Sequence, residues 1–261
     1  MTHKTAIITG GATGVGAATA SLLASRGYNV LINYSRSADE AIAVSAACQA
    51  LGVDAFSAQG DVSSDVDCRA LVKLAADRWG QVDALVNSAG ATRFIPMADL
   101  DAVTTADFER IFAVNTIGPF QMARAVRAYM PQSGAIVNVS SIAGVIGSGS
   151  SMPYVLSKAA LNTLTIALAR LLAPGIRVNA VLPGMIDGRW MRDGLGDEAF
   201  ERAKLHAASA SALGKITQPE HIASAIAWLL EPDCMVTGQL IPVDGGFMLG
   251  RPPAPAPGGK R

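Results

Sequence analysis

The chain has 261 residues, half of them hydrophobic, and carries 21 basic and 21 acidic side chains, so its formal net charge is zero. This length suffices for one large α/β domain or two small ones. The neutral balance argues against nucleic acid or an anionic membrane as a partner. The three cysteines, Cys48, Cys68 and Cys234, form no CxxC or Cys/His cluster. We therefore expect no metal site and no disulfide framework.

The N-terminus, Met1-Thr2-His3-Lys4, leads directly into an apolar segment. It lacks the apolar core and small-residue cleavage site of a signal peptide. The sequence has no uninterrupted apolar run of about 18 residues, so no membrane-spanning helix is expected. These features predict a cytoplasmic protein without a membrane partner.

Short apolar runs alternate with longer helical patterns along the chain. The apolar runs predict strands at residues 5–9, 29–33, 54–59, 84–87, 135–139, 176–182 and 239–243. The helical patterns predict helices at residues 15–26, 39–51, 64–79, 107–129, 154–172 and 219–230. A further helix at 197–208 either covers an apolar ligand or only caps the sheet. Repeated strand–helix–strand units imply parallel strands, because a crossover helix returns the chain to the same end of the sheet.

The predicted architecture is a single-domain, doubly wound parallel sheet of about seven strands, a Rossmann fold in the α/β class with helices on both faces. Runs such as Ile7-Ile8 and Ile136-Val137 are apolar at consecutive positions, which is typical of strands covered on both sides. The domain would occupy residues 1–250 and include a substrate loop at 185–213. The Pro- and Gly-rich segment 251–261 would form a tail.

The first predicted strand runs into Thr9-Gly10-Gly11-Ala12-Thr13-Gly14-Val15-Gly16, a TGxxxGxG sequence, and a helix follows. Glycines at such a turn allow the backbone to approach a pyrophosphate, which then faces the N–H groups and positive dipole of the helix N-terminus. The turn joins the first strand to the first helix of an α/β chain, so it predicts a dinucleotide site rather than a purely structural turn. The candidate contacts are Gly10, Thr13, Gly14, Val15 and Gly16.

The end of the second strand indicates which dinucleotide is bound. NAD-binding proteins with this fold usually carry an acidic residue there, which holds the ribose hydroxyls. This chain reads Asn33-Tyr34-Ser35-Arg36-Ser37, without a carboxylate. The Arg36 guanidinium and the hydroxyls beside it suit a 2′-phosphate, so the sequence favours NADP(H) over NAD(H). The alternative is that Arg36 is a solvated loop cation.

Tyr154 and Lys158 form a YxxxK pair on the helix predicted at 154–172. Residues four apart lie on one face of a helix, so the phenol and the ammonium are expected to be neighbours. A nearby cation favours the charged form of a tyrosine, and we expect it to lower the pKa of Tyr154. Such a pair also occurs on ordinary solvated helix faces, so its meaning depends on the rest of the chain.

Further motifs follow the glycine turn at fixed spacing. They are Asp61-Val62, Asn87-Ser88-Ala89-Gly90, Asn115, Ser141, Tyr154 with Lys158, and Pro183-Gly184. Over residues 4–246 this set resembles the short-chain dehydrogenase/reductase family. The last strand continues into Val243-Asp244-Gly245-Gly246, and this ending resembles 3-oxoacyl-acyl-carrier-protein reductases and related carbonyl reductases.

The resemblance implies an oxidoreductase that transfers a hydride between a nicotinamide and a carbonyl or secondary alcohol, such as a 3-oxoacyl group or another medium-sized ketone. Tyr154 would be the acid or base, and Ser141 would hold the substrate oxygen. Lys158 would hold the nicotinamide ribose, and Asn115 would hold a water that links Lys158 to solvent. The implied cofactor contacts are Asn33, Tyr34, Ser35, Arg36, Asp61, Val62, Asn87, Ala89, Gly90, Tyr154, Lys158, Pro183, Gly184 and Ile186.

Two positions depart from the family pattern. Gly188 stands where the family often has a Thr that touches the nicotinamide carboxamide. Thr13 stands where NADP-dependent members often have a basic residue. Simpler interpretations also exist: Ser141 as a turn residue in a flexible 140–151 stretch, Asn115 as a polar group inside a helix, and Tyr154 as a surface tyrosine.

Apolar residues near the predicted site indicate the substrate wall: Ile146, Met152 and Trp190 would join Ser141 and Tyr154 in contacting a small carbonyl or alcohol. By resemblance, a homotetramer or homodimer is expected, built through the long helices and the last strand. His3, His206 and His221 lie outside the motifs and are interpreted as surface or structural residues. Two alternatives to a reductase are an epimerase or dehydratase with the same fold and a non-catalytic NAD(P) sensor. The sensor is disfavoured because the Tyr–Lys pair is present.

Overall fold

The computed structural model describes residues 3–250, in which the strands belong to one sheet. The strands are β1 (Thr5–Thr9), β2 (Asn29–Tyr34), β3 (Ala55–Gln59), β4 (Ala84–Asn87), β5 (Gly134–Val139), β6 (Ile176–Pro183) and β7 (Leu240–Val243). The longer helices are α1 (Gly14–Ser25), α2 (Ala38–Gln49), α3 (Asp65–Trp79), α4 (Thr105–Phe112), α5 (Gly118–Val126), α7 (Met152–Leu172), α9 (Asp197–Ala210) and α10 (Pro219–Leu229). Shorter turns are η1 (Ala113–Ile117), α6 (Ala143–Ile146), α8 (Arg189–Leu195) and η2 (Phe247–Leu249).

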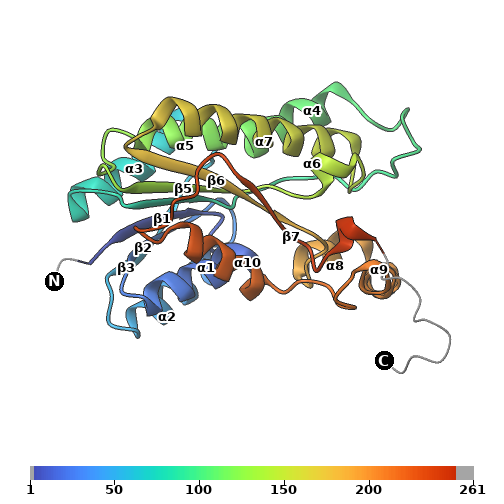
Figure 1. Cartoon of the computed structure of the whole chain (residues 1–261), viewed down its shortest axis with the longest axis horizontal. Helices are drawn as coiled ribbons and strands as arrows, with labels where there is room; N and C mark the ends of the chain where they lie inside the picture. Colours follow the sequence, from blue (N-terminus) through green and yellow to red (C-terminus); the bar gives the residue numbers. More distant parts are fainter. Residues whose placement is uncertain (1–2, 251–261) are drawn as a thin grey trace.

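The seven strands are all parallel and follow the order β3-β2-β1-β4-β5-β6-β7. Helices α3, α4, α5 and α7 lie over one face, and α1, α2 and α10 lie over the other (Figure 1). The predicted doubly wound α/β sheet is therefore confirmed. The chain leaves β1 toward β2 and then crosses back to β4, so the order reverses between β1 and β4. Ligands of such sheets bind beyond the carboxyl ends of the strands at this reversal.

The two faces of the sheet are built from alternate residues of the same strands. In β1, Ala6 and Ile8 join the core under α1, α2 and α10, whereas Ile7 joins the core under α3, α5 and α7. All three side chains are fully buried. Successive side chains of a strand point to opposite faces, so a strand covered on both sides must be apolar at every position. This explains the continuous apolar runs that predicted the strands.

The predicted single helix at 107–129 is wrong in its interior and at its end. The segment is α4 followed by one π-helical turn, η1, and then by α5, which ends at Val126. Pro119 has no N–H and cannot donate to the carbonyl of Asn115 four residues earlier, so the α-helical hydrogen-bond pattern is interrupted there. The N–H of Gly118 instead reaches the carbonyl of Ala113, five residues back. The wider turn holds Asn115.

Two short helices were not predicted. The four-residue α6 lies inside the 140–151 stretch that was expected to be flexible, and the seven-residue α8 begins the predicted substrate loop. The predicted helix at 197–208 is confirmed as α9. The tail predicted at 251–261 lies outside the described residues.

Helix α7 has the length and hydropathy to cross a membrane, and it is the one helix of the described range with both properties. In this fold, 44% of the 18-residue apolar segment of α7 is buried inside the protein. Its first turns also bury Tyr154 and Lys158 beside the sheet, as in a core helix of a globular domain.

Candidate active site

The glycine turn between β1 and α1 is packed too closely for side chains at two of its glycines. A Cβ on Gly16 would lie 2.2 Å from the carbonyl oxygen of Gly10, and a Cβ on Gly10 would lie 2.8 Å from the Cα of Ala89. Gly10 also has a φ of +61°, a left-handed conformation that favours glycine. Thr9 links the turn to the segment after β4, because its hydroxyl accepts hydrogen bonds from the N–H groups of Ser88 and Ala89. These glycines are therefore required by the local geometry.

The N-terminus of α1 leaves room for an anion. Gly14 has a φ of +53°, and a Cβ placed on it would meet no atom of the described chain within 4 Å. Within residues 3–250, the side chain of Thr13 makes no capping hydrogen bond to the helix. The Thr13 side chain therefore leaves the first-turn N–H groups of α1 available to an anion, which the helix dipole favours there. The residues present fit the pyrophosphate of a dinucleotide.

The predicted ribose segment separates into two parts at the end of β2. Asn33 is buried and acts as a brace, since its Nδ2 donates to the Gly60 carbonyl at 3.0 Å and its Oδ1 accepts from the Gly10 N–H at 3.4 Å. Ser35 and Arg36 are exposed. Gln59 at the end of β3 donates to the Ser35 carbonyl at 3.1 Å. The structure therefore leaves Arg36 accessible to an anionic ligand, whereas Asn33 supports the glycine turn. Tyr34, between them, is half-buried and packs against the core under α1.

The predicted contacts after β3 and β4 are a mixture of exposed and buried groups. Asp61 is exposed, and its carboxylate accepts from the N–H and hydroxyl of Ser63. Val62 is buried against Gly118, and a Cβ added to Gly118 would lie 3.0 Å from the Val62 side chain. Asn87 donates to the side chain of Asn138 at 2.8 Å, and its own Oδ1 is buried without a partner among the described residues. Gly90 is exposed at the carboxyl edge of the sheet.

Tyr154 and Lys158 lie together at the carboxyl edge, as predicted from their spacing. The Lys158 Nζ is 5.7 Å from the centroid of the Tyr154 ring. Both residues are buried, with exposed fractions of 8% for Tyr154 and 4% for Lys158. The Lys158 ammonium donates to the carbonyl of Val139, at the end of β5, at 2.8 Å. The description of Tyr154 as a surface tyrosine is therefore excluded.

Asn115, in η1, is fully buried and joins the loop after β4 to the start of α7. Its Oδ1 accepts from the Ala91 N–H at 2.7 Å, and its Nδ2 donates to the Ala91 carbonyl at 2.9 Å and to the Ser157 hydroxyl at 3.0 Å. The Ser157 hydroxyl in turn donates to the Tyr154 carbonyl at 2.7 Å. A chain of hydrogen bonds thus runs from the loop after β4, through η1, to the helical turn that carries Tyr154.

The pKa values differ from the expectation that Lys158 lowers that of Tyr154. Burial raises the pKa of Tyr154 to about 12, and the Ser141 side chain opposes this rise. Burial also lowers the pKa of Lys158 to about 8. Desolvation disfavours the charged form of each group and is the largest effect on the pKa of both. Around pH 7 the phenol is therefore protonated and the ammonium is largely charged, which suits a proton donor next to a cation.

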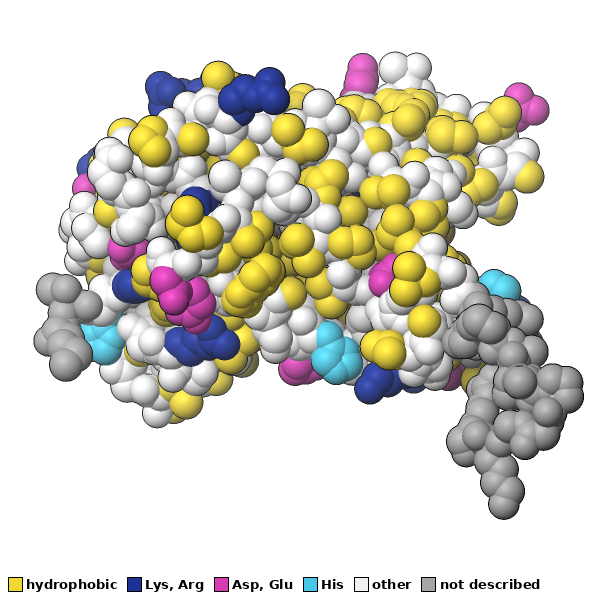
Figure 2. Space-filling model, viewed as in Figure 1, with side chains coloured by type: hydrophobic (Ala, Val, Ile, Leu, Met, Phe, Trp, Pro, Cys, Tyr) yellow, Lys and Arg dark blue, Asp and Glu magenta, His cyan; other side chains and the backbone are white. Residues whose placement is uncertain are grey.

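Ser141 and Trp190 both lie against Tyr154. The Ser141 hydroxyl accepts from the N–H of Ala143 at 3.1 Å and lies close enough to Tyr154 to affect its pKa. Trp190, in α8, packs edge-on against the Tyr154 ring with centroids 5.9 Å apart and planes at 71°. Ile146 is exposed and Met152 is half-buried nearby in the chain. Figure 2 shows a hollow at this end of the molecule, between the upper layer and the lobe of α8 and α9, with hydrophobic side chains around it.

We refer to α8 and α9, residues 189–210, as the lid. Its connection to the sheet passes through Pro183, Gly184 and Ile186. A Cβ on Gly184 would lie 3.0 Å from the Cα of Asp244, so this glycine is needed for packing against the segment after β7. Ile186 pairs with Thr217 in an isolated bridge. Gly188 has an extended backbone and open space around its Cβ position, so the structure would accept a side chain there.

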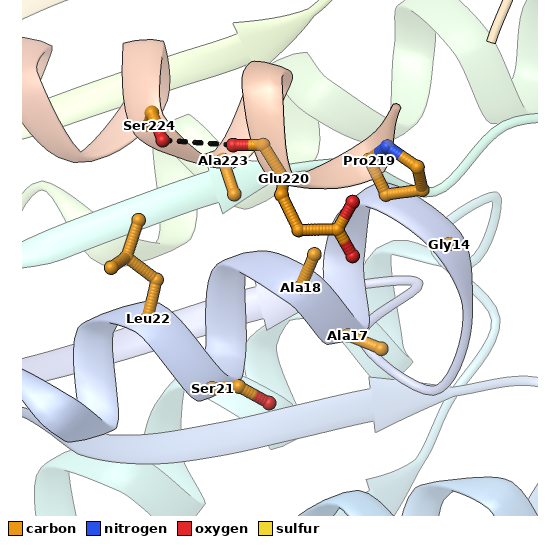
Figure 3. A pocket seen from close by; sticks show the side chains of 9 residues that line it. All are labelled: Gly14, Ala17, Ala18, Ser21, Leu22, Pro219, Glu220, Ala223 and Ser224. Atoms are coloured by element: carbon orange, nitrogen blue, oxygen red, sulfur yellow. Dashed lines mark hydrogen bonds between the residues drawn. The ribbon is translucent and has the colours of Figure 1, made fainter. Parts of the chain in front are cut away.

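A separate hollow of about 630 Å³ lies between α1 and α10 (Figure 3). Small residues from both helices form its walls, and the Glu220 carboxylate points toward α1. Of the nine lining residues, Gly14 alone belongs to the predicted cofactor contacts. This hollow meets the candidate cofactor site only at Gly14, and it lies on the face of the sheet opposite α7, which carries Tyr154.

The sequence predicted the chemical groups of the site but not the groups that position them. Ser157 links Asn115 to the Tyr154 turn, and the Val139 carbonyl anchors Lys158. A buried serine one position before Lys158 was visible in the sequence, yet its role depends on the π-helical turn opposite. The three histidines are confirmed as surface or structural: His3 bonds the Gly27 carbonyl, His221 accepts from the Gln218 N–H at the start of α10, and His206 is exposed.

A doubly wound parallel sheet with an open helix N-terminus after β1 and a buried Tyr–Lys pair beyond β5 defines a dinucleotide-binding α/β protein equipped for proton transfer. The family model described as enoyl-(acyl carrier protein) reductase matches residues 10–248. This match covers most of the chain, which belongs to the short-chain dehydrogenase/reductase family.

Several known proteins are similar over nearly their whole length. A candidate ketoacyl reductase of the granaticin polyketide synthase from Streptomyces violaceoruber is 38% identical, over 94% of this chain and 96% of that protein. The 3-oxoacyl-acyl-carrier-protein reductase FabG of Staphylococcus aureus is 35% identical over 94% and 98%. A solved short-chain dehydrogenase/reductase from Serratia marcescens, in a doubly substituted form, superposes with a TM-score of 0.84 at 32% identity, over 94% and 97%.

These relationships make the chain an oxidoreductase that acts on a carbonyl group of a small molecule and uses a nicotinamide cofactor. The reductase expected from the sequence is confirmed at this level.

Proposed function

We propose that the protein reduces a 3-oxoacyl group or a ketone of similar size with NADP(H), and that Tyr154 donates the proton. One observation carries this proposal: Tyr154, Lys158 and Ser141 converge at the carboxyl edge of β5, with Asn115 fixing the adjoining turn. The reductase relatives support the substrate class, since two of them are named for ketoacyl or 3-oxoacyl reduction.

The cofactor would be held along the carboxyl edge of the sheet. Gly14 and its neighbours would take the pyrophosphate at the N-terminus of α1, and the exposed Arg36 would take a 2′-phosphate. The other proposed contacts are Gly10, Thr13, Val15, Gly16, Tyr34, Ser35, Asp61, Val62, Ala89, Gly90, Pro183, Gly184 and Ile186. Asn33 and Asn87 would contribute by bracing the strands. When bound, the nicotinamide supplies the hydride that reduces the carbonyl.

The chain's own residues would manage the charge that develops on the substrate oxygen. The Ser141 hydroxyl would hold that oxygen, and the Tyr154 phenol would give it a proton. Burial keeps the phenol protonated in the free enzyme, because it raises the pKa of Tyr154 to about 12. The Lys158 ammonium beside it would stabilise the phenolate left after proton transfer.

Lys158 has donors to spare for this role. One N–H is used by the Val139 carbonyl, and an ammonium has three donors, so two are left for the nicotinamide ribose and for a water. Asn115 would hold that water, which would return a proton to the site from solvent. Its side chain is committed to Ala91 and Ser157, so we assign the water to its backbone carbonyl, which Pro119 deprives of its α-helical donor.

The substrate would enter the hollow beside the lid and meet Trp190, Ile146 and Met152. The Trp190 ring already covers one side of Tyr154, so it would form the wall against which an acyl chain packs. One link between the lid and the body is the exposed Arg189–Glu40 ion pair, which would separate when the lid opens to admit a ligand.

We further propose a cytoplasmic homotetramer or homodimer. Apolar side chains are exposed on the outer faces of η1, α5 and α7, including Ile117, Phe120 and Ile166, and also on α10, at Trp228. Exposed apolar side chains on neighbouring helices are typical of surfaces that pair with a second subunit. Light scattering of the purified protein tests this proposal, and a monomer at micromolar concentration contradicts it.

The test of the proposed function is a panel of 3-oxoacyl thioesters and simple ketones, each offered with NADPH and with NADH. We expect absorbance loss at the reduced nicotinamide band with NADPH and a 3-oxoacyl thioester. A preference for NADH contradicts the cofactor assignment. Consumption of neither the 3-oxoacyl thioesters nor the ketones contradicts the substrate class.

A further inference from the structure

Arg189 connects two parts of the molecule that lie at opposite ends of the proposed cofactor site. It is the first residue of α8, and its Nη1 donates to Oε1 of Glu40, in the first turn of α2, at 2.8 Å. The next residue, Trp190, packs edge-on against Tyr154. Two consecutive lid residues therefore extend from the catalytic tyrosine to the helix that follows β2. The beginning of α8 therefore extends across the proposed cofactor site, from α7 to α2.

The Glu40 end of this ion pair is in the segment proposed for the 2′-phosphate. Arg36 lies four residues before Glu40, in the loop that joins β2 to α2, and it is exposed. The ion pair therefore brings a second guanidinium, from a distant part of the chain, to the residue four positions after Arg36. The other acidic neighbours are Asp39, in the same helical turn as Glu40, and Asp193, whose carboxylate is 3.9 Å from the Arg189 Nε.

The ion pair is well suited to exchange. Both partners are solvent-accessible, with side-chain exposures of 57% for Arg189 and 42% for Glu40. Exposed pairs of this kind contribute little to stability, and their partners separate easily. A phosphate monoester carries more charge than a carboxylate and accepts two parallel hydrogen bonds from a guanidinium, so it competes well for an arginine.

We propose that Arg189 is a specificity-determining residue for the 2′-phosphate of NADP(H), and that Glu40 is the counterion which the phosphate displaces. This inference rests on the proposed function. It places part of the cofactor selectivity in the lid, outside the β2 segment from which the sequence predicted it. NAD(H) has no 2′-phosphate, so its binding would leave the Arg189–Glu40 pair in place.

The test is calorimetric titration of the purified, cofactor-free protein with NADPH and NADH. ADP-ribose and its 2′-phosphate are titrated in parallel, since they lack the nicotinamide and report on this end of the groove alone. The variants are Arg189→Gln, Glu40→Gln and the matched control Arg192→Gln. Arg192 lies in the same helix but pairs with Asp197 and Glu201 inside the lid.

We expect Arg189→Gln to lower the affinity for both 2′-phosphorylated ligands by about tenfold, as for the loss of one charge-assisted contact. The affinities for NADH and ADP-ribose should change by less than about twofold. Glu40→Gln should raise the affinity for the two 2′-phosphorylated ligands by a few-fold. Misfolding would not produce this opposite effect. Arg192→Gln should leave all four affinities within about twofold.

An equal loss of affinity for NADPH and NADH in Arg189→Gln would overturn the inference. It would show that Arg189 only holds the lid in place and does not recognise the 2′-phosphate. Unchanged binding in that variant would overturn it as well. If the unmodified protein bound neither dinucleotide, the proposed function itself would fail, and this inference with it. The two failures are therefore distinguishable from the titrations of the unmodified protein.

Discussion

The floor of the candidate site and the lid above it are held in opposite ways. The floor consists of η1, the end of β5 and the first turns of α7, and its polar groups are buried and hydrogen-bonded: Asn115, Asn138 and Ser157 are all fully buried. The charged groups of the lid form exposed ion pairs: Arg189 pairs with Glu40 of α2, and Arg192 pairs with Asp197 and Glu201 inside the lid.

This difference has energetic consequences. Removing one partner from a buried polar network costs roughly 1–3 kcal/mol, because the other partner is left desolvated. An exposed ion pair contributes about 0–1 kcal/mol. We therefore expect the floor to act as a rigid frame for the chemistry, and the exposed ion pairs of the lid to be exchanged at low cost.

The largest effect should come from the floor. We expect Tyr154→Phe to lower turnover of a 3-oxoacyl thioester by about 10²–10⁴-fold, the usual contribution of a positioned general acid. The ring and its contact with Trp190 are kept, so NADPH affinity and the thermal unfolding temperature should stay close to those of the unmodified protein. Turnover within tenfold of the unmodified enzyme would exclude Tyr154 as the proton donor.

The sequence predicted most of the floor because its signals are local or fixed in spacing. The glycine turn is dictated by sterics, as the 2.2 Å approach to Gly16 shows, and the Tyr154–Lys158 pair follows from helical periodicity. The strands were predicted within about one residue, since double-sided burial makes them continuously apolar.

Other features of the floor depend on contacts that no local pattern reports. The π-helical turn around Asn115 was predicted as ordinary helix, because a periodicity of 3.6 residues does not reveal a single wider turn. The high pKa of Tyr154 was also missed. Its direction is decided by how deeply the ring is buried, and this depends on α7 packing against the sheet.

The lid was the least predictable region. Its seven-residue helix α8 is too short for a periodic signal, and the reach of Arg189 to Glu40 joins residues 149 positions apart. The sequence indicated a substrate loop at 185–213 but could not indicate that this loop touches α2.

A matched pair of glycine substitutions compares the stability of the glycine turn with that of the residue before the lid. Gly16→Ala should lower the free energy of unfolding by about 1–3 kcal/mol, because its Cβ would overlap the Gly10 carbonyl. This corresponds to a fall of several degrees in the unfolding temperature. Gly188→Ala should leave the temperature unchanged or raise it slightly, since the backbone there is extended and the space is open. Equal losses in the two variants, measured by thermal unfolding with circular dichroism, would contradict this contrast.

The pH dependence of reduction should reflect the buried pair. Tyr154, with a pKa of about 12, remains a proton donor throughout the neutral range. Lys158, with a pKa of about 8, is charged below that pH and loses its charge as the pH rises through it. We therefore expect kcat/KM for reduction to be flat from pH 6 to 7 and to fall above about pH 8. A rate that rises between pH 7 and pH 9 would contradict the assignment of a charged Lys158.

The most direct test of the division between floor and lid is the steady-state kinetics of two alanine variants with the same 3-oxoacyl thioester and saturating NADPH. Ser141→Ala removes the hydroxyl that would hold the reacting oxygen, so kcat should fall by about 10²-fold or more. Trp190→Ala removes a wall of the substrate cleft, so KM should rise by about tenfold while kcat changes by a few-fold at most. We expect this split, with the effect on kcat in Ser141→Ala and the effect on KM in Trp190→Ala. A large loss of kcat in Trp190→Ala, together with an almost unchanged kcat in Ser141→Ala, would contradict it.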